Sequence, residues 1–288
     1  MSTYKATPGS ASRRSRAHRI RVLGSALAAA LLATTALTAV PAVAGAQVAH
    51  PFQPGERMTY DVRFSAMKVG TGSMEVRGIT EVRGRPAYHT VFRVRGGTLF
   101  YRVDDVFESW FATDDLSSLR FHKDQDEGPK ERQVKYEIYP ERQAYNETTK
   151  NKGEQPSVEQ PLDEGSFLYL VRTVPLEPGQ TYHFNRYFKP DRNPVTIRVL
   201  RRERVKVPAG TFDAIVVQPV IKSKGIFSEG GQAEVWLSDD DNRMLLQIKS
   251  RLSIGSLNLY LKSYYLPNAI VAGSERKANV EQPMASGY

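Results

Sequence analysis

The sequence predicts an all-β, mainly antiparallel fold: a strongly curved sheet or open β-barrel of ten or more strands around one short helix. Polar and large apolar residues alternate with a period of two, which is typical of strands with one buried face. Glycine and proline separate these runs at short intervals, as in an antiparallel meander. A single segment has helical periodicity instead. A β-sandwich is the alternative architecture.

The alternation is clearest in four segments, and each is expected to place its apolar residues on one face. These residues are Met58, Tyr60, Val62 and Phe64; Tyr88, Phe92 and Val94; Val134, Tyr136 and Ile138; and Leu257, Leu259 and Leu261. Residues 207–212 are expected to form a tight turn between two strands, with Pro208 presetting one backbone angle and Gly210 supplying a positive φ.

Residues 163–174 predict the helix. Apolar residues fall at positions 167, 170, 171 and 174, Asp163 is suited to the N-cap, and Pro175 follows the end. The preceding stretch, 146–160, is polar and predicts a mobile connection between two strand-rich halves. Residues 273–288 are expected to be a disordered tail, so residues 47–272 form a single β-rich domain.

The N-terminus predicts a signal peptide over residues 1–46. Five arginines between positions 13 and 21 precede an apolar stretch at 22–43, and Ala44-Gly45-Ala46 provides small residues for cleavage after Ala46. A transmembrane anchor is the alternative, but alanine and threonine dominate the stretch and Pro41 interrupts it. The residues after Arg13-Arg14 do not fit the twin-arginine route, so we expect general secretory export to the periplasm.

Cysteine and charge exclude several classes of protein. The chain contains no cysteine, so neither a lipid-anchored lipoprotein nor a disulfide-stapled scaffold is expected. Six of the nine units of net positive charge lie before residue 22, which leaves +3 for the rest. That balance gives no reason to expect a nucleic-acid partner. The chain after residue 46 has no further apolar run of transmembrane length, and we expect it to be soluble.

No catalytic residue, metal site or cofactor is expected. The four histidines after residue 46 are not at metal-ligand spacing from one another, and the G-x-S-x-G motif of serine hydrolases is absent. Residues 239–242, Asp-Asp-Asp-Asn, have oxygens suited to calcium but lack the spacing of a calcium-binding loop. We interpret them as a hairpin turn between strands at 233–237 and 244–248.

Two groups of side chains are candidate binding residues. Aromatic residues suited to lining an apolar ligand cavity are Phe100, Phe107, Trp110 and Trp236. Core packing is the alternative role for them. Basic residues that form a candidate anion patch on one strand are Arg198, Arg202, Arg204 and Lys206. A solvated strand face is the alternative, and anionic lipid headgroups are the natural target if the patch is functional.

Five motifs resemble those of the DUF3108 family of exported bacterial proteins, a domain of unknown function. They are GERMTYDV at 55–62, Gly70, DEGSFLYLVR at 163–172, VPAGTFDA at 207–214 and EVWLSDD at 234–240. The resemblance spans nearly the whole chain after the signal peptide. It implies an all-β periplasmic domain and carries no established catalytic residue. In architecture alone, the chain is also similar to periplasmic lipoprotein carriers, whose curved sheet closes over a helix to hold acyl chains.

These observations favour an exported, soluble and non-catalytic module that binds or carries an apolar or amphipathic, lipid-like ligand. The alternative is an envelope-assembly protein that binds a protein partner through a sheet edge or through the basic strand. An enzyme comes third, because no catalytic constellation is visible.

Overall fold

The computed structural model describes residues 50–98, 101–150, 152–222, 233–251 and 256–267. These residues belong to the larger of two compact units of the chain, Gly45–Tyr288. The expected signal peptide and C-terminal tail lie outside the described residues. No helix in the described part of the chain is long and apolar enough to cross a membrane.

The described residues contain fourteen strands, which form one open sheet. Its order is β8-β7-β6-β5-β4-β3-β2-β1-β14-β13-β12-β11-β10-β9. The strands are β1 (Arg57–Phe64), β2 (Met67–Val82), β3 (Arg85–Thr98), β4 (Tyr101–Ala112), β5 (Ser118–Glu127), β6 (Lys130–Tyr139), β7 (Ala144–Glu147), β8 (Glu154–Pro156), β9 (Thr181–Phe184), β10 (Val195–Val207), β11 (Gly210–Val220), β12 (Glu234–Ser238), β13 (Leu245–Arg251) and β14 (Ser256–Tyr265). All pairings between these strands are antiparallel.

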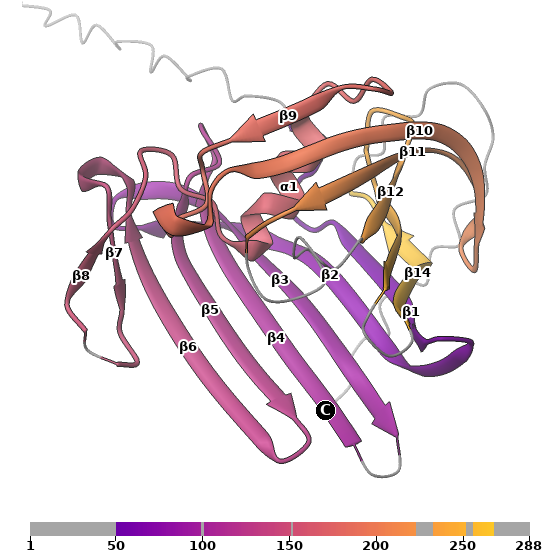
Figure 1. The fold of residues 1–288 in the computed structure, drawn as a ribbon, viewed down its shortest axis with the longest axis horizontal. Coiled ribbons are helices and arrows are strands. Elements are labelled where there is room, and N and C mark those ends of the chain that lie inside the picture. Colours follow the sequence, from indigo (N-terminus) through magenta and orange to yellow (C-terminus); the bar gives the residue numbers. More distant parts are fainter. Residues whose placement is uncertain (1–49, 99–100, 151, 223–232, 252–255, 268–288) are drawn as a thin grey trace, which may run out of the picture. The chain divides into compact units, whose positions relative to one another are not determined.

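The sheet curves around the helix α1 (Glu164–Thr173). In Figure 1 the long strands β2–β6 form one wall, and β10 and β11 pass on the other side of α1. The helix contacts both parts of the sheet at a small cavity. This cavity is lined by Met74 of β2, Leu168 and Val171 of α1, and Val235 and Leu237 of β12. The prediction of an open curved sheet with one α-helix is therefore confirmed.

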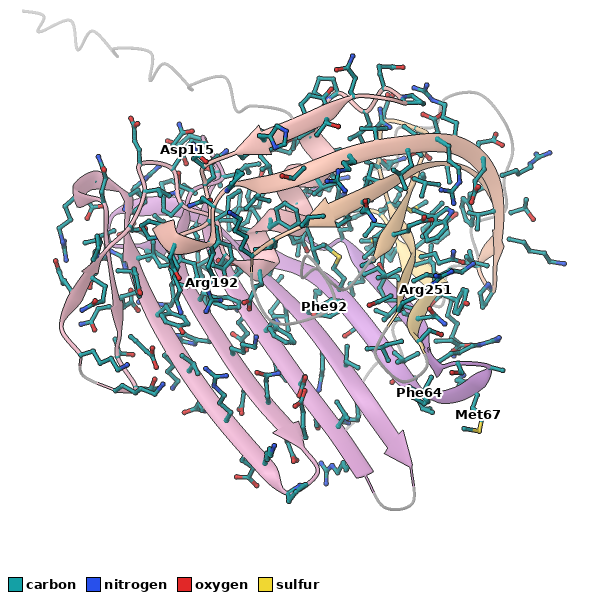
Figure 2. All side chains as sticks on the ribbon, in the orientation of Figure 1. Phe64, Met67, Phe92, Asp115, Arg192 and Arg251 are labelled. Carbon is teal, nitrogen blue, oxygen red and sulfur yellow. The ribbon has the colours of Figure 1, made fainter. Side chains whose placement is uncertain are left out.

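Alternation explains why the strands bury one face. Met58, Tyr60 and Val62 of β1 are all buried, whereas Thr59 between them is exposed. The apolar side of α1 contributes Phe167 and other buried residues to the same core. Figure 2 shows the side chains of the described residues on this ribbon.

Local signals place α1 where the sequence predicts it. Asp163 is the N-cap, and its Oδ1 accepts hydrogen bonds from the backbone N–H groups of Gly165 at 2.7 Å and Ser166 at 2.8 Å. Ser166 Oγ accepts the backbone N–H of Asp163 at 2.9 Å, which completes a capping box. The helix ends at Thr173, two residues before Pro175. The predicted helix is confirmed.

Two predicted turns are also confirmed. Residues 239–242 join β12 to β13, and Asp240 Oδ1 accepts the backbone N–H groups of Asn242 at 3.0 Å and Arg243 at 3.1 Å. This is the local bonding expected of aspartate in a turn. Val207 pairs with Gly210 at the β10–β11 hairpin, and Gly210 has a φ of +144°.

Gly210→Val is expected to lower the free energy of unfolding by about 1 kcal/mol or more, because a β-branched side chain is strained at a positive φ. Thermal unfolding measures the change. Gly78→Val is the matched control, since Gly78 has no positive φ and no atom lies within 4 Å of the added Cβ. Equal melting temperatures for Gly210→Val and the unsubstituted protein would show that the turn tolerates a side chain.

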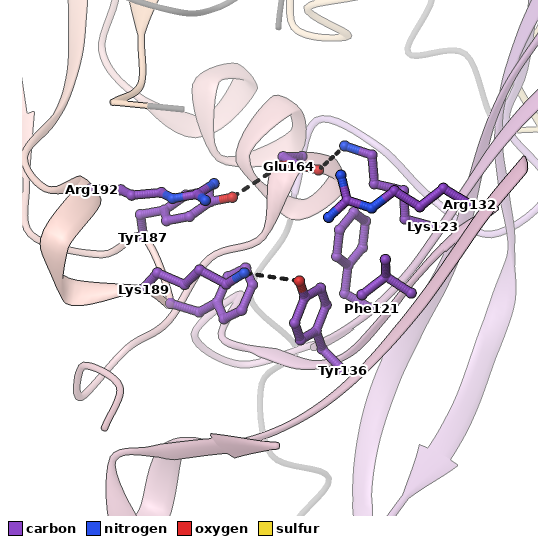
Figure 3. A pocket seen from close by; sticks show the side chains of 10 residues that line it. Phe121, Lys123, Arg132, Tyr136, Glu164, Tyr187, Lys189 and Arg192 are labelled. Carbon is purple, nitrogen blue, oxygen red and sulfur yellow. Dashed lines mark hydrogen bonds and ion pairs between the residues drawn. The ribbon is translucent and has the colours of Figure 1, made fainter. Parts of the chain in front are cut away.

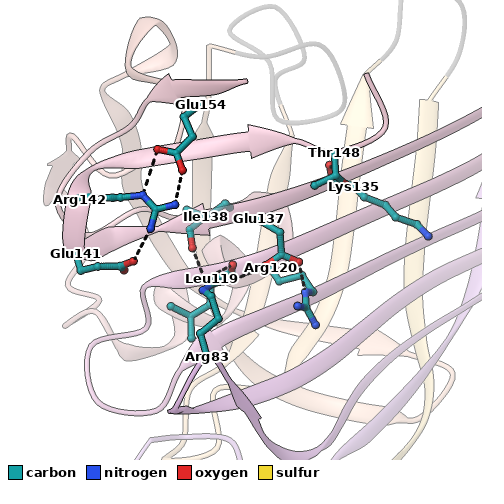
Figure 4. Close-up of polar contacts among 10 residues, drawn as sticks. All are labelled: Arg83, Leu119, Arg120, Lys135, Glu137, Ile138, Glu141, Arg142, Thr148 and Glu154. Carbon is teal, nitrogen blue, oxygen red and sulfur yellow. Dashed lines mark hydrogen bonds and ion pairs between the residues drawn. The ribbon is translucent and has the colours of Figure 1, made fainter. Parts of the chain in front are cut away.

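The stretch 146–160, which the sequence predicts as a mobile connection, contributes the end of β7 and all of β8 to the sheet edge. Figure 4 shows the polar contacts around these strands. Arg142 Nε donates to Glu154 Oε2 at 3.2 Å, linking the 3-10 helix η1 (Pro140–Arg142) to β8. Arg83 donates to the backbone carbonyls of Leu119, at 2.9 Å, and Ile138. These contacts attach the β2–β3 turn to β5 and β6.

Candidate functional site

A pocket of about 260 Å³ lies between the β5–β6 hairpin, the start of α1 and the segment that precedes β10. Figure 3 shows its side chains pointing toward one another. The lining residues are Phe121 and Lys123 of β5; Arg132, Val134 and Tyr136 of β6; Glu164 of α1; and Tyr187, Phe188, Lys189 and Arg192. Arg192 ends the 3-10 helix η2 (Pro190–Arg192).

Strand alternation supplies one wall of the pocket. Phe121 pairs with Tyr136 across β5 and β6, and Lys123 pairs with Val134. Residues two apart on a strand share a face, so these four side chains and Arg132 project together. Phe121, Val134 and Tyr136 are buried, which gives the wall an apolar and aromatic base.

The opposite wall comes from a distant part of the chain. Leu162, just before α1, forms an isolated parallel bridge with Tyr187, and the backbone N–H of Phe188 donates to Leu162 O at 2.9 Å. Asn193 holds the segment by accepting the Tyr187 N–H at 2.8 Å and donating to Tyr187 O at 3.0 Å. These bonds position Lys189 and the η2 turn against β6, where Lys189 contacts Tyr136.

The pocket has a clear excess of positive charge. Four cationic side chains line it, Lys123, Arg132, Lys189 and Arg192, against the single carboxylate of Glu164. That carboxylate is already occupied: Lys123 Nζ lies 3.2 Å from Oε2, and the Tyr187 hydroxyl donates to Oε1 at 3.0 Å. Among the described residues, Arg132, Lys189 and Arg192 form no ion pair. Three cations are therefore left for an anionic ligand.

Burial acts on the titrating groups of the pocket. It lowers the pKa of Lys189 to about 8, with a further contribution from the Arg192 charge. The Lys189 ammonium donates to the Tyr136 hydroxyl at 2.8 Å and lies 4.4 Å from the centroid of that ring. Burial raises the pKa of Tyr136 to about 12, so the phenol stays neutral. At neutral pH the site combines cations with uncharged aromatic walls, a combination suited to an anion with an apolar body.

The predicted aromatic residues do not come together in one cavity. Phe107 of β4 faces the helix side and lies beside the pocket, with Lys123 Nζ 5.0 Å from its ring centroid. Trp110, three residues on, lies on the other face, where His89 stacks on it at 4.4 Å and Arg120 approaches it. Phe100 lies outside the described residues.

Trp236 lies on the face opposite to Val235 and Leu237, which point toward α1. It is only 3% exposed, and its Nε1–H donates to Glu203 Oε1 at 2.6 Å. The Lys249 ammonium lies 5.1 Å from its ring centroid. Trp236 therefore belongs to the hydrophobic core, with charged side chains beside its ring, and it does not line the pocket.

The predicted anion patch on β10 lies outside the pocket, and carboxylates neutralise much of it. Arg202 pairs with Glu177 and Asp239, both at 3.0 Å, and Arg204 lies 3.5 Å from Asp213. The other two members are Arg198, which donates to the Gln218 side chain at 3.1 Å, and Lys206.

Sequence reasoning missed the pocket cations. Lys123 and Arg132 lie on the apolar faces of their strands, and a cation at a position where alternation expects an apolar residue was a usable signal. Lys189 and Arg192 had no such signal, because they lie outside regular strands. In the described part of the chain, no group of three or more histidine, aspartate or glutamate side chains is placed to hold a metal ion.

Comparison with known proteins gives a family and distant structural likenesses. A beta-barrel-like protein of the domain of unknown function DUF1849 from Brucella abortus is 9% identical, with a TM-score of 0.48 over 75% of this chain and 99% of that one. A candidate lipoprotein from Parabacteroides distasonis is 13% identical, with a TM-score of 0.34 over 75% and 98% of the two chains. A search of curated proteins found no match.

The family match is more direct. The model of DUF3108, described as "Protein of unknown function (DUF3108)", matches residues 59–262. That range begins in β1 and ends in β14, so it includes the helix, both pocket walls and all of the motifs noted above except the start of the first. The chain therefore belongs to the DUF3108 family.

Proposed function

We propose that this protein is an exported, non-catalytic module that binds an amphipathic anion in the pocket between β5, β6 and residues 187–192. The observation that supports this is the excess of three positive charges over aromatic walls. Apolar burial contributes affinity roughly in proportion to area, and the cations select the sign of the headgroup. The signal-like N-terminus and the membership of DUF3108 support a periplasmic location for this activity.

The alternative, an envelope-assembly protein that binds a partner by strand addition, has less support. The two edge strands are β8, with three residues including Pro156, and β9, with four. Short edges and proline restrict the addition of a further strand. The basic strand β10 also offers less free charge than its composition indicates, because Arg201, Arg202 and Arg204 pair with carboxylates of the protein.

Decanoate binding tests the proposal. We expect the protein to bind decanoate but not decyltrimethylammonium, which has the same chain and the opposite charge. Lys189→Gln/Arg192→Gln is expected to weaken decanoate binding about tenfold or more, because charged hydrogen bonds contribute about 1.5–3 kcal/mol. Isothermal titration calorimetry gives the dissociation constants. The protein for this experiment is purified from the envelope of the bacterium that produces it. Its intact mass then also tests export, because cleavage after Ala46 leaves a chain that begins at Gln47.

The matched control is Arg204→Gln/Lys206→Gln, which removes the same charge from β10. Its affinity for decanoate is expected to equal that of the unsubstituted protein. If both double variants weaken decanoate binding equally, the anion binds elsewhere or its affinity depends only on the net charge of the protein, and either result contradicts the proposed site. Absence of decanoate binding would contradict the proposal.

A further inference from the structure

Asp105 is a buried carboxyl group on the pocket side of the sheet. It lies in β4, two residues from Phe107, and pairs with Val94 of β3 and Gln125 of β5. Residues two apart on a strand share a face, so Asp105 projects to the same side as Phe107 and Lys123. Its residue exposure is only 8%.

One oxygen of this carboxyl group has no partner. Among the described residues, Oδ1 has no hydrogen-bond partner, while Oδ2 accepts the Gln125 side chain at 3.3 Å. The Glu127 carboxyl group also interacts with that of Asp105 and, like burial, raises its pKa. The same Gln125 amide also lies 3.5 Å from Glu127. Lys123 offsets part of the charge of Asp105, but its ammonium group is paired with Glu164. Buried polar atoms in folded proteins nearly always have a partner, so this one needs an explanation.

Asp105 lies on the same face of the sheet as the pocket residues Lys123 and Arg132, between them and two aromatic rings. The Phe107 and Phe92 rings are 6.2 Å apart across β4 and β3, and both are only partly buried against the core. Phe92 is labelled in Figure 2. On the other side, Asp105, Gln125 and the pocket residue Arg132 lie in one row across β4, β5 and β6. Two strand spacings separate Asp105 from Arg132, about 10 Å.

We propose that Asp105 is a specificity-determining residue: its free oxygen accepts a hydrogen bond from a hydroxyl or N–H group in the apolar part of a ligand whose anionic head occupies the pocket. This inference rests on the proposed function and narrows the ligand to an amphipathic anion that carries a hydrogen-bond donor. The partly buried Phe107 and Phe92 rings contact the apolar part beside that donor. Burial, with a further contribution from the Glu127 carboxylate, raises the pKa of Asp105 to about 6.

Calorimetry with decanoate and hydroxydecanoates, with the hydroxyl at carbons 3 to 10, tests this role. We expect at least one hydroxydecanoate to bind the unsubstituted protein about tenfold more tightly than decanoate, as a hydrogen bond to a charged acceptor predicts. Asp105→Leu should abolish that preference. Asp105→Asn should retain part of it, because its amide oxygen still accepts. Asp124→Leu, at an exposed position on the other face of β5, should leave the preference unchanged.

Two results would overturn the inference while leaving the proposed function intact. One is decanoate binding with no preference for any hydroxydecanoate. The other is a preference that survives in Asp105→Leu. If neither decanoate nor its hydroxylated forms bind, the proposed function and this inference both fail. Melting temperatures identify misfolded variants, and Asp105→Leu is not expected to unfold because it removes an unpaired polar group.

Discussion

Arg172→Met is expected to lower the free energy of unfolding by about 3–5 kcal/mol, because it leaves Glu56 charged and buried without a partner. The Arg172 side chain is 0% exposed and that of Glu56 is 2% exposed. Nη1 donates to Oε1 at 2.5 Å and Nη2 to Oε2 at 2.9 Å. Nη2 also lies 2.8 Å from the carbonyl oxygens of Pro51 and Asn242. One guanidinium therefore joins α1, the chain before β1 and the β12–β13 turn.

A double-mutant cycle in urea separates the pair from its surroundings. Glu56→Met/Arg172→Met is expected to be less destabilised than the sum of the two single variants, since no unpaired buried charge remains. Arg142→Met, whose partner Glu154 is exposed, is the control and should change the free energy of unfolding far less than Arg172→Met, because solvent screens an exposed ion pair. Additive effects at Glu56 and Arg172 would contradict a direct coupling between them.

Asp163→Leu is the second large effect, with an expected loss of about 3 kcal/mol or more in the free energy of unfolding. The substitution removes the N-cap of α1, which contributes about 1–2 kcal/mol. It also leaves two buried hydroxyl groups without their acceptor, at about 1–3 kcal/mol for each unpaired group. Ser109 Oγ donates to Asp163 Oδ2 at 2.6 Å, and Ser118 Oγ donates to the same oxygen. Urea unfolding monitored by circular dichroism measures the loss.

Asp163→Asn is the control, because asparagine can still accept hydrogen bonds but does not titrate. The difference in stability between this variant and the unsubstituted protein should depend on pH, and burial of Asp163 determines its sign. Desolvation raises the pKa of Asp163 to about 6, above its ordinary value of 3.8, against the opposing hydrogen bonds from Ser109 and Ser118. The folded protein therefore binds the proton more tightly than the unfolded chain. This contribution to stability is present at low pH and is lost as pH rises from about 4 to about 6. Asparagine does not titrate, so its stability relative to aspartate should improve across that window. A pH-independent difference would contradict the raised pKa.

Asp163 and Arg172 lie at the two ends of α1, and both help to position the pocket residue on that helix. Asp163 precedes Glu164, the one acidic residue of the pocket, and Arg172 anchors the other end of the same helix. Buried ionic groups thus hold α1 at both ends between the two walls of the sheet. A variant that loosens either end is expected to displace Glu164 as well.

Local sequence signals were sufficient for much of the fold. Alternation at Met58, Tyr60 and Val62 correctly identified a strand with one buried face, because the pleat of a strand is set within a few residues. Capping by Asp163 and turn formation at Asp240 and Gly210 are equally local, since each depends on backbone groups two or three residues away. Strand alternation also predicts that Phe107 and Trp110 lie on opposite faces of β4, because they are an odd number of positions apart.

Local patterns in the amino-acid sequence therefore predict the β-rich class, the helix and two turns, and its motifs indicate the DUF3108 family. The pocket, in contrast, exists only in the folded chain, because its two walls come from β5 and β6 and from residues 187–192. Periodicity specifies which side chains share a face, but it does not specify which distant segment lies against that face. Lys189 contacts Tyr136 because the bridge between Leu162 and Tyr187 holds the segment that follows Tyr187 in place, and this bridge joins the two segments of the chain that flank α1. Long-range closure of this kind depends on the packing of the whole sheet, and no local pattern encodes it.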